Sequence, residues 1–197
     1  MRHPGGLNRR LVLTSFASLG LTALRPRSGA AKARFDVLEL KTAIIGRIAE
    51  FVRWPAESGL HEPDRPFEFV VLGDTPLWQH LFSYYWERSV NIAEHRVFLR
   101  RARDISAVGR SAHLLFVGPS YEERLEEIVS TLGRSSVLTV GDTQGYAHRG
   151  LAVNLYVSGE MVRFEASRRA FERHGLSPSY RLMALARLID DQQARAP

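Results

Sequence analysis

Two Gly-Asp-Thr triplets are the best candidates for chemistry in this sequence of 197 residues. Gly73-Asp74-Thr75 and Gly141-Asp142-Thr143 each follow a short apolar run that is typical of a strand. In an open parallel sheet, ligands and partners meet the loops at the carboxyl ends of the strands. An aspartate there can accept hydrogen bonds or pair with an arginine. Ordinary turn and helix-cap chemistry is the alternative interpretation of both triplets, and we expect the two turns to lie near each other.

Other groups of reactive side chains have simpler interpretations. Glutamates at positions 122, 123, 126 and 127 suit the solvated face of a helix, whose first turn favours negative charge. Five arginines between positions 96 and 110 suit a solvated edge strand, although they could also contact an anionic ligand or membrane headgroups. Aromatic residues at positions 54, 78, 84, 85 and 86 could line a small-molecule pocket or belong to the core.

Enzyme motifs are absent from the sequence. It contains no G-x-S-x-G, no G-x-x-x-x-G-K, no H-E-x-x-H and no G-x-G-x-x-G after a strand. No two histidines beyond residue 33 stand four positions apart, and there is no cysteine, so thiolate chemistry is excluded and a metal site has little support. We therefore predict no catalytic residues, no metal and no cofactor.

The surplus of positive charge is confined to the start of the chain. Residues 1–33 contain six of the 27 Lys and Arg and none of the 21 Asp and Glu, so the remainder is formally neutral. Three arginines precede the apolar run 11–24, which is shorter than the span of about 20 residues that a membrane helix needs, and small residues follow it. We predict a signal peptide over 1–33, cleaved between Ala30 and Arg34, and a periplasmic location.

Export leaves several alternatives open. An uncleaved signal anchor is the main one, and the adjacent Arg9 and Arg10 leave both the Sec and the twin-arginine route open.

The part of the chain after residue 33 has no net charge and gives little support to nucleic-acid binding, which draws its affinity from a basic surface. No linker or repeat interrupts 34–191, which we interpret as one domain, with 192–197 as a flexible tail.

Alternating elements predict the fold class. Apolar residues at helical spacing indicate a first helix that ends at Trp54, before Pro55. Strand-like runs and helical runs then alternate; the strands are 67–72, 95–101, 113–117 and 137–140, and the helices are 76–86, 104–109 and 121–132. Ser120 and Glu123 suggest a capping box for the last of these helices. This alternation is typical of a parallel sheet with helices on both faces.

The C-terminal third differs from that pattern. Strands 151–157 and 161–165 are joined by only three residues, which requires an antiparallel hairpin. Alternation in the second strand predicts that Val162 and Phe164 face inward and that Arg163 and Glu165 face outward. Helices 167–174 and 180–190 close the chain, the second capped by Ser177 or Ser179. We therefore predict a single α/β domain with a mainly parallel sheet of about six strands, helices on both faces and a C-terminal antiparallel hairpin.

Several short segments, taken in order, resemble the YfiR family from about Lys41 to Ile189. They are Phe51-Val52-Arg53-Trp54-Pro55, Val71-Leu72-Gly73-Asp74, His113-Leu114-Leu115-Phe116-Val117, Val137-Leu138-Thr139-Val140, Asp142, Gly145, Arg149-Gly150, Val153-Asn154-Leu155, Val162-Arg163-Phe164-Glu165, Gly175-Leu176 and Arg181-Leu182. Each segment is common by itself, and their order and spacing carry the resemblance.

The resemblance implies a function. Members of the YfiR family are exported, non-enzymatic α/β proteins of the periplasm, and the best-known type represses a membrane-bound diguanylate cyclase by binding its periplasmic portion. This chain would then restrain cyclic-di-GMP synthesis and biofilm formation. We expect its partner- or ligand-binding residues to be Trp54, Gly73, Asp74, Asp142 and Arg149. The alternative is a periplasmic small-ligand sensor whose pocket lies between the two Gly-Asp turns, and a homodimer stays open.

This sequence also departs from the family pattern. Ala112 stands where members often have a cysteine, so a redox response through cysteines is excluded here. Ala166-Ser167 replaces the usual Ile-Asn, Gly141 replaces a serine and Leu151 replaces a second glycine. These changes bear on the identity of the partner more than on the fold.

Overall fold

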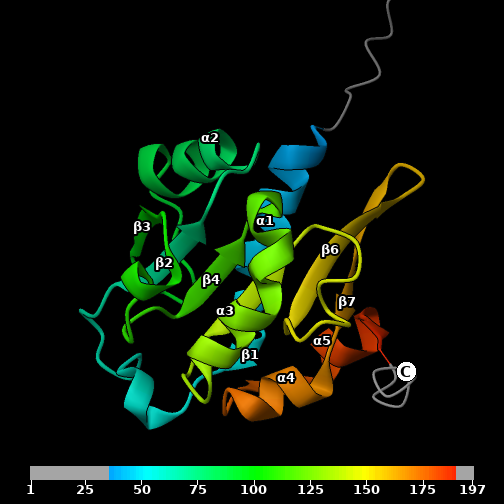
Figure 1. The fold of residues 1–197 in the computed structure, drawn as a ribbon. Coiled ribbons are helices and arrows are strands. Elements are labelled where there is room, and N and C mark those ends of the chain that lie inside the picture. The colour runs from blue at the N-terminus through cyan, green and yellow to red at the C-terminus, as the bar shows by residue number, and fades with distance from the viewer. Residues whose placement is uncertain (1–35, 190–197) are drawn as a thin grey trace, which may run out of the picture. The chain divides into compact units, whose positions relative to one another are not determined.

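A seven-stranded sheet is the frame on which the other elements are placed (Figure 1). The computed structural model describes residues 36–189, which belong to one compact unit. The expected signal peptide and C-terminal tail lie outside the described residues. Across the sheet the order is β3, β2, β4, β5, β6, β7, β9, and the strands are β2 (Phe67–Leu72), β3 (Val97–Ala102), β4 (Leu114–Val117), β5 (Leu138–Gly141), β6 (Val153–Ser158), β7 (Met161–Ala166) and β9 (Arg187–Leu188).

The direction of the strands confirms the predicted fold class. Neighbours from β3 to β6 are parallel, and β6 and β7 form the expected antiparallel hairpin. The strand β9 then adds to β7 in a parallel sense and makes the seventh strand. A separate two-stranded sheet joins β1 (Val52–Arg53) to β8 (Ser177–Pro178).

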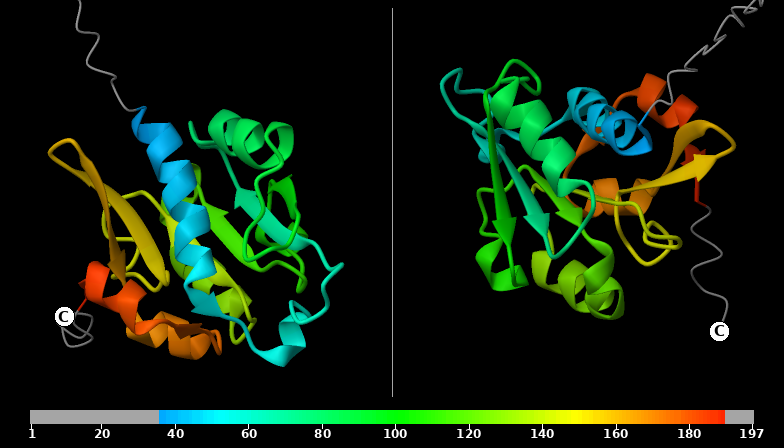
Figure 2. Two further views of the ribbon diagram at one scale, coloured as in Figure 1. Left: turned by 180° about the vertical axis from the view of Figure 1, so that it is seen from behind. Right: turned by 90° about the horizontal axis from the view of Figure 1, so that it is seen from above.

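Helices cover both faces of the sheet. The helical elements are α1 (Val37–Glu50), η1 (Ala56–Ser58), α2 (Trp78–Leu81), the π-helix η2 (Phe82–Glu87), η3 (Ile105–Ala107), η4 (Pro119–Arg124), α3 (Leu125–Leu132), α4 (Arg168–Arg173) and α5 (Tyr180–Leu185). Figure 1 shows α3 in front of the sheet, and the view from behind in Figure 2 shows α1 across the opposite face. None of the helices between residues 36 and 189 is long and apolar enough to cross a membrane.

Strand β2, the second from the edge of the sheet, has core residues on both of its faces. Phe69 and Val71 belong to the cluster that also contains apolar residues of α1, whereas Val70 and Leu72 belong to the cluster that contains Leu125 of α3. Successive side chains of a strand point to opposite faces, so a strand between two helical layers is apolar throughout. All four of these β2 residues are fully buried.

The first helix ends earlier than expected. It stops at Glu50, and the next residues form β1, which pairs with β8 more than a hundred positions later. The Ser179 backbone N–H also donates to the Phe51 carbonyl oxygen at 2.8 Å. Backbone groups that leave a helix near the core need such partners. The prediction that the helix runs to Trp54 was wrong because those partners are remote in sequence.

The last helix is also shorter than expected. It ends at Leu185, and Ala186 adopts an extended conformation that leads into β9. The new strand pairs with β7, and the Ile189 N–H donates to the Ala166 carbonyl oxygen at 3.2 Å. Pairing satisfies backbone groups of β7 that an edge strand would leave open.

Two side chains have roles other than those expected. Ser120 is no helix cap, because η4 begins after Gly118 with Pro119 in its first turn, and the Ser120 hydroxyl instead accepts a hydrogen bond from the Asp74 N–H. Glu165 is buried rather than outward-facing, and its carboxylate pairs with Arg187 of β9. The expected cap at Ser179 is confirmed, since its hydroxyl accepts from the Leu182 N–H. Ser167, which we expected as the first residue of its helix, is instead the cap of α4, and its hydroxyl accepts from the Ala170 N–H.

Candidate functional site

The carboxyl ends of β2, β4 and β5 lie side by side and carry the two Gly-Asp turns. Strand β4 separates the turns, which places them roughly 10 Å apart at the usual strand spacing. The backbone after β4 approaches the first turn closely, since a Cβ on Gly118 would lie 2.5 Å from the Asp74 carbonyl oxygen. Tyr146, from the loop after β5, donates its hydroxyl to the Gly118 carbonyl oxygen at 3.2 Å. The turns are therefore joined through the end of β4.

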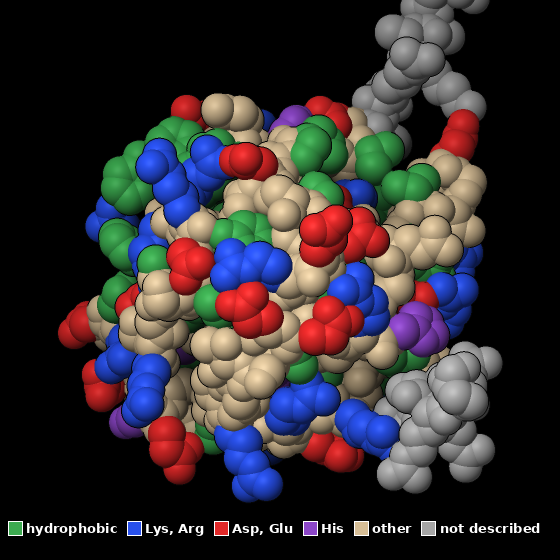
Figure 3. Space-filling model, in the orientation of Figure 1, with side chains coloured by type: hydrophobic (Ala, Val, Ile, Leu, Met, Phe, Trp, Pro, Cys, Tyr) green, Lys and Arg blue, Asp and Glu red, His purple; other side chains and the backbone are tan. Residues whose placement is uncertain are grey.

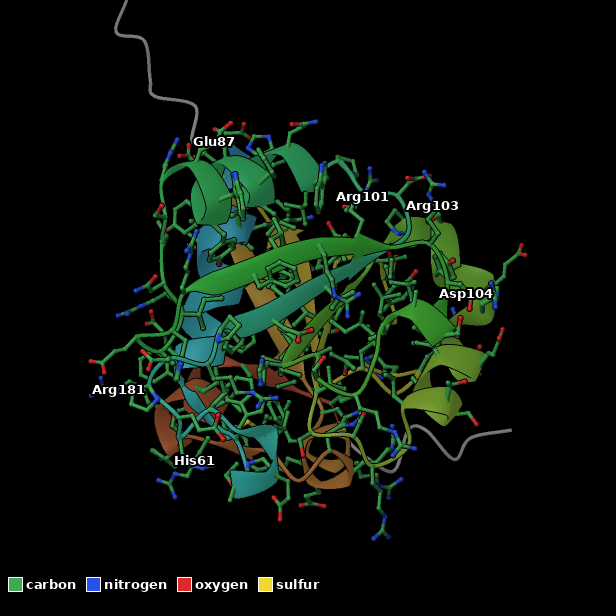
Figure 4. All side chains as sticks on the ribbon, turned by 90° about the vertical axis from the view of Figure 1, so that its left-hand side faces the viewer. His61, Glu87, Arg101, Arg103, Asp104 and Arg181 are labelled. Atoms are coloured by element: carbon green, nitrogen blue, oxygen red, sulfur yellow. The ribbon has the colours of Figure 1, made fainter. Side chains whose placement is uncertain are left out.

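Asp74 is the most accessible of the expected site residues. Its side chain is 93% exposed, and Oδ1 accepts a hydrogen bond from Arg101 at 3.0 Å. The Arg101 guanidinium also lies over the ring of Trp78, 4.9 Å from the ring centroid. Figure 4 shows Arg101 with Arg103 and Asp104 at the carboxyl end of β3. This end of the sheet therefore presents an exposed carboxylate among arginines and an aromatic ring.

Gly73 allows the Asp74 turn to form. Its φ is +80°, a region that residues with a Cβ rarely adopt. A Cβ at this position would lie 2.4 Å from the Ser120 hydroxyl and 2.5 Å from the Tyr121 ring. The Ser120 hydroxyl in turn holds the Asp74 N–H at 2.9 Å. Gly73 thus acts by positioning the turn, with no side chain to offer a partner.

Asp142 is engaged inside the molecule. Its Oδ2 accepts a hydrogen bond from the Lys41 ammonium at 2.8 Å, and the two side chains are only 13% and 12% exposed. The pair ties α1 to the carboxyl end of β5. This carboxylate offers far less surface to a partner than that of Asp74.

Arg149 also has a partner within the chain. Its guanidinium donates to both carboxylate oxygens of Glu126, at 2.7 and 2.8 Å, and to the Glu122 carbonyl oxygen at 2.7 Å. These hydrogen bonds lower the pKa of Glu126 to about 2. The contacts fasten the loop after β5 to η4 and α3. Acidic and basic side chains are correspondingly intermixed over the face that carries α3 (Figure 3).

Trp54 lies apart from the other expected site residues. Its ring meets Phe67 edge to face with centroids 5.4 Å apart, at the amino end of β2. The indole N–H is buried and has no hydrogen-bond partner among residues 36–189. The structure therefore gathers Gly73, Asp74, Asp142 and Arg149 around one end of the sheet and places Trp54 at the other.

Lys41, Arg101 and Ser120 are neighbours of this site that sequence reasoning missed. A lone lysine within an apolar helix is a signal for a buried acidic partner, but the sequence does not show which residue that partner is.

Within the part of the chain that the structure describes, no group of three or more His, Cys, Asp or Glu could hold a metal ion. At its surface the site offers the exposed Asp74 carboxylate and the Arg101 guanidinium.

A family model described as YfiR/HmsC-like matches residues 38–187. The chain belongs to the YfiR/HmsC-like family. This confirms the resemblance found in the sequence, and the match covers nearly all of the described residues. Members of the YfiR/HmsC-like family are periplasmic regulators of diguanylate cyclases rather than enzymes.

Solved structures agree with the fold. A conserved domain protein from Vibrio cholerae is similar to this chain at 11% identity with a TM-score of 0.55, covering 78% of this chain and 60% of that one. This chain thus spans less than two thirds of that protein, and the likeness shows the fold alone. An ABC domain from Streptococcus pneumonia, in complex with L-Trp, has 7% identity and a TM-score of 0.47 over 63% of this chain and 55% of its own, which supports no argument. No curated protein matches the sequence.

Proposed function

We propose that this protein is exported and inhibits a membrane-bound diguanylate cyclase by binding its periplasmic portion. Lower cyclic-di-GMP and less biofilm would follow. The observation that carries the proposal is the YfiR/HmsC-like match over residues 38–187. Export rests on the charge and length pattern of residues 1–33, and N-terminal sequencing of the exported protein should begin between residues 31 and 34. Recovery of intact Met1 in the membrane fraction would contradict that part of the proposal.

The surface around Asp74 is the best candidate for the contact. Its carboxylate is exposed on a rigid strand end, and its pairing with Arg101 is exposed as well. Exposed ion pairs contribute at most about 1 kcal/mol, so a partner's arginine can replace Arg101 at little cost. Aromatic rings add to this surface: Trp78 packs in a tilted arrangement against Phe82, and Phe82 stacks with Trp86, each pair with centroids 6.2 Å apart. Trp86 is 50% exposed.

The remaining expected site residues support that surface in this proposal. Asp142 holds α1 through Lys41, and Arg149 holds α3 through Glu126, so both keep the strand-end loops in place. Gly73 shapes the turn itself. Trp54 lies at the opposite end of the sheet and would contact only a partner that reaches both ends.

Asp74→Ala tests the contact surface. We expect cells that express the variant with its cyclase to show raised cyclic-di-GMP, because truncating one member of a desolvated charge pair costs about 2 to 5 kcal/mol, which is more than tenfold in affinity. The purified variant should melt within about 2 °C of the parent, since surface substitutions usually change stability by less than about 0.5 kcal/mol. Asp64→Ala, which removes another exposed aspartate, is the matched control and should leave repression intact.

Two results would separate the parts of this proposal. Unchanged cyclic-di-GMP in a stable Asp74→Ala variant would reject the Asp74 surface as the contact. Unchanged cyclic-di-GMP after deletion of the whole protein would reject cyclase inhibition itself.

A further inference from the structure

A pocket of about 600 Å³ lies at the amino ends of β4 and β5, the end of the sheet opposite the Gly-Asp turns. Segments 105–113 and 131–136 and the end of η1 line it. In Figure 1 the cyan segment that contains η1 and the carboxyl end of α3 lie together at the lower end of the molecule. The volume falls within the range of about 300 to 1,000 Å³ that is usual for small-molecule sites.

His113 fixes one wall of this pocket. Its Nδ1 accepts a hydrogen bond from the Glu68 N–H at 2.9 Å, so the proton lies on Nε2, which donates to the Ser58 carbonyl oxygen at 3.0 Å. Burial keeps the pKa of His113 below its ordinary value. The ring is therefore neutral at pH 7 and both its nitrogens are occupied. It ties η1 to the start of β4 and adds no charge to the pocket.

Arg100 fixes the wall that carries residues 105–111. Its guanidinium donates to the Ala107 carbonyl oxygen at 2.8 Å and also to the Val108 carbonyl oxygen. The chain then turns at Gly109, whose φ is +75°. These contacts hold the turn before any ligand arrives, so the pocket is largely preformed and binding needs little further ordering.

The charged groups that line the pocket are mostly guanidinium groups. The lining contains three arginines, Arg65, Arg110 and Arg134, and a single carboxylate, that of Glu57. Between residues 36 and 189, neither Arg110 nor Arg134 has a carboxylate within 4 Å, and the Arg65 pair with Glu62 is long at 3.9 Å. By contrast, Arg149 and Arg124 are held by carboxylates at 2.7 to 2.9 Å.

Hydroxyl groups complete the lining. Ser111, Thr131 and Ser136 all contribute to it. Hydroxyls donate hydrogen bonds to oxyanions, and the planar fork of arginine matches both carboxylate and phosphate groups. The formal net charge of residues 34–197 is zero, so this positive pocket is a local feature rather than part of a generally basic surface.

We propose that this pocket binds a small organic anion, whose carboxylate or phosphate group is held by Arg110 and Arg134. The inference does not rest on cyclase inhibition, because the Asp74 surface lies at the other end of the sheet. It differs from the sensor expected from the sequence, which placed the ligand between the two Gly-Asp turns.

Titration of the exported protein with inorganic phosphate and, separately, with citrate tests the proposal. Calorimetry at constant ionic strength should show saturable binding of at least one of these two anions. The double variant Arg110→Gln/Arg134→Gln should bind it at least about tenfold more weakly, since it loses two charge-assisted hydrogen-bond donors. Arg163→Gln is the matched control: the same change at an exposed arginine of β7, outside the pocket lining, should leave affinity unchanged.

The outcomes are distinct. Saturable binding that is lost in the double variant and kept in Arg163→Gln supports the proposal, and the anion that binds identifies the group recognised. Equal binding by all three proteins would place the anion elsewhere and overturn it. Absence of saturation by both anions up to about 10 mM would overturn it as well. Both arginines are exposed, so we expect the variants to fold; should the double variant melt early, each single variant gives the same test.

Discussion

Removing one partner of the Lys41–Asp142 pair should destabilise the protein far more than removing an exposed charge. The two groups are 2.8 Å apart, and their side chains are only 12% and 13% exposed. Breaking a buried pair on one side typically costs about 3 to 5 kcal/mol, because it leaves an uncompensated charge. Because both side chains keep slight solvent exposure, we expect the lower value of that range: Asp142→Asn and Lys41→Met should each lower the free energy of unfolding by about 3 kcal/mol.

Thermal and urea unfolding of the purified variants measure this cost. In a domain of this size, 1 kcal/mol shifts Tm by about 2 to 4 °C, so each single variant should melt about 6 to 12 °C lower than the parent. The double variant Lys41→Met/Asp142→Asn removes both charges and should be no less stable than either single variant, because the pair's net contribution is small once both ions are gone.

An exposed pair on the same helix provides the control. Glu39 of α1 accepts from Arg88 at 3.1 Å, and the two side chains are 53% and 57% exposed. Glu39→Gln should cost less than about 1 kcal/mol. If Asp142→Asn costs no more than Glu39→Gln, or if the two single losses simply add in the double variant, the reasoning about a shielded ion pair is refuted.

Two further predictions concern the backbone and pH. The urea midpoint of unfolding should be clearly lower for Gly73→Ala than for Gly145→Ala. Both glycines have positive φ, so a Cβ at either position adds about 1 to 2 kcal/mol of backbone strain. Only at Gly73 would the Cβ also collide with Ser120, while nothing lies within 4 Å at Gly145. Burial lowers the pKa of His113 and of His174 in the folded protein, whereas a histidine in the unfolded chain has a pKa of about 6.5. The unfolded chain therefore binds more protons than the folded protein below about pH 6.5, and stability should fall as pH drops through that value. NMR resonances of either imidazole that titrate at or above about pH 6.5 would contradict this prediction.

Local sequence determined the element types and their order. Apolar runs between turn residues predicted the inner strands. The short connection after residue 157 required the antiparallel hairpin, because no crossover fits it, although Ser158 proves to belong to β6 and leaves only residues 159–160 in the loop. Ser179 was recognisable as one of two candidate caps of the last helix, since a cap bonds only to the first turn of its own helix. Motifs read in order were also enough to identify the family.

Long-range pairing decided where the helices end. Helical spacing alone predicted that the first helix ends at Trp54 and the last at residue 190. In the structure, β1 and β9 take the place of those predicted helix ends. Each of these two-residue strands exists because its backbone finds a partner, β8 or β7, that is distant in the chain. Propensity is a weak prior that such tertiary contacts override.

The tertiary structure likewise divided the expected site and revealed the pocket. Asp74 and Asp142 are equivalent as sequence triplets, yet one is exposed and the other is paired with a lysine 101 positions earlier. The arginines of the amino-end pocket come from loops before different strands. A sequence specifies which charges exist, but their exposure and their neighbours depend on which strand ends the fold brings together, because burial and Coulomb interactions act through space rather than along the chain.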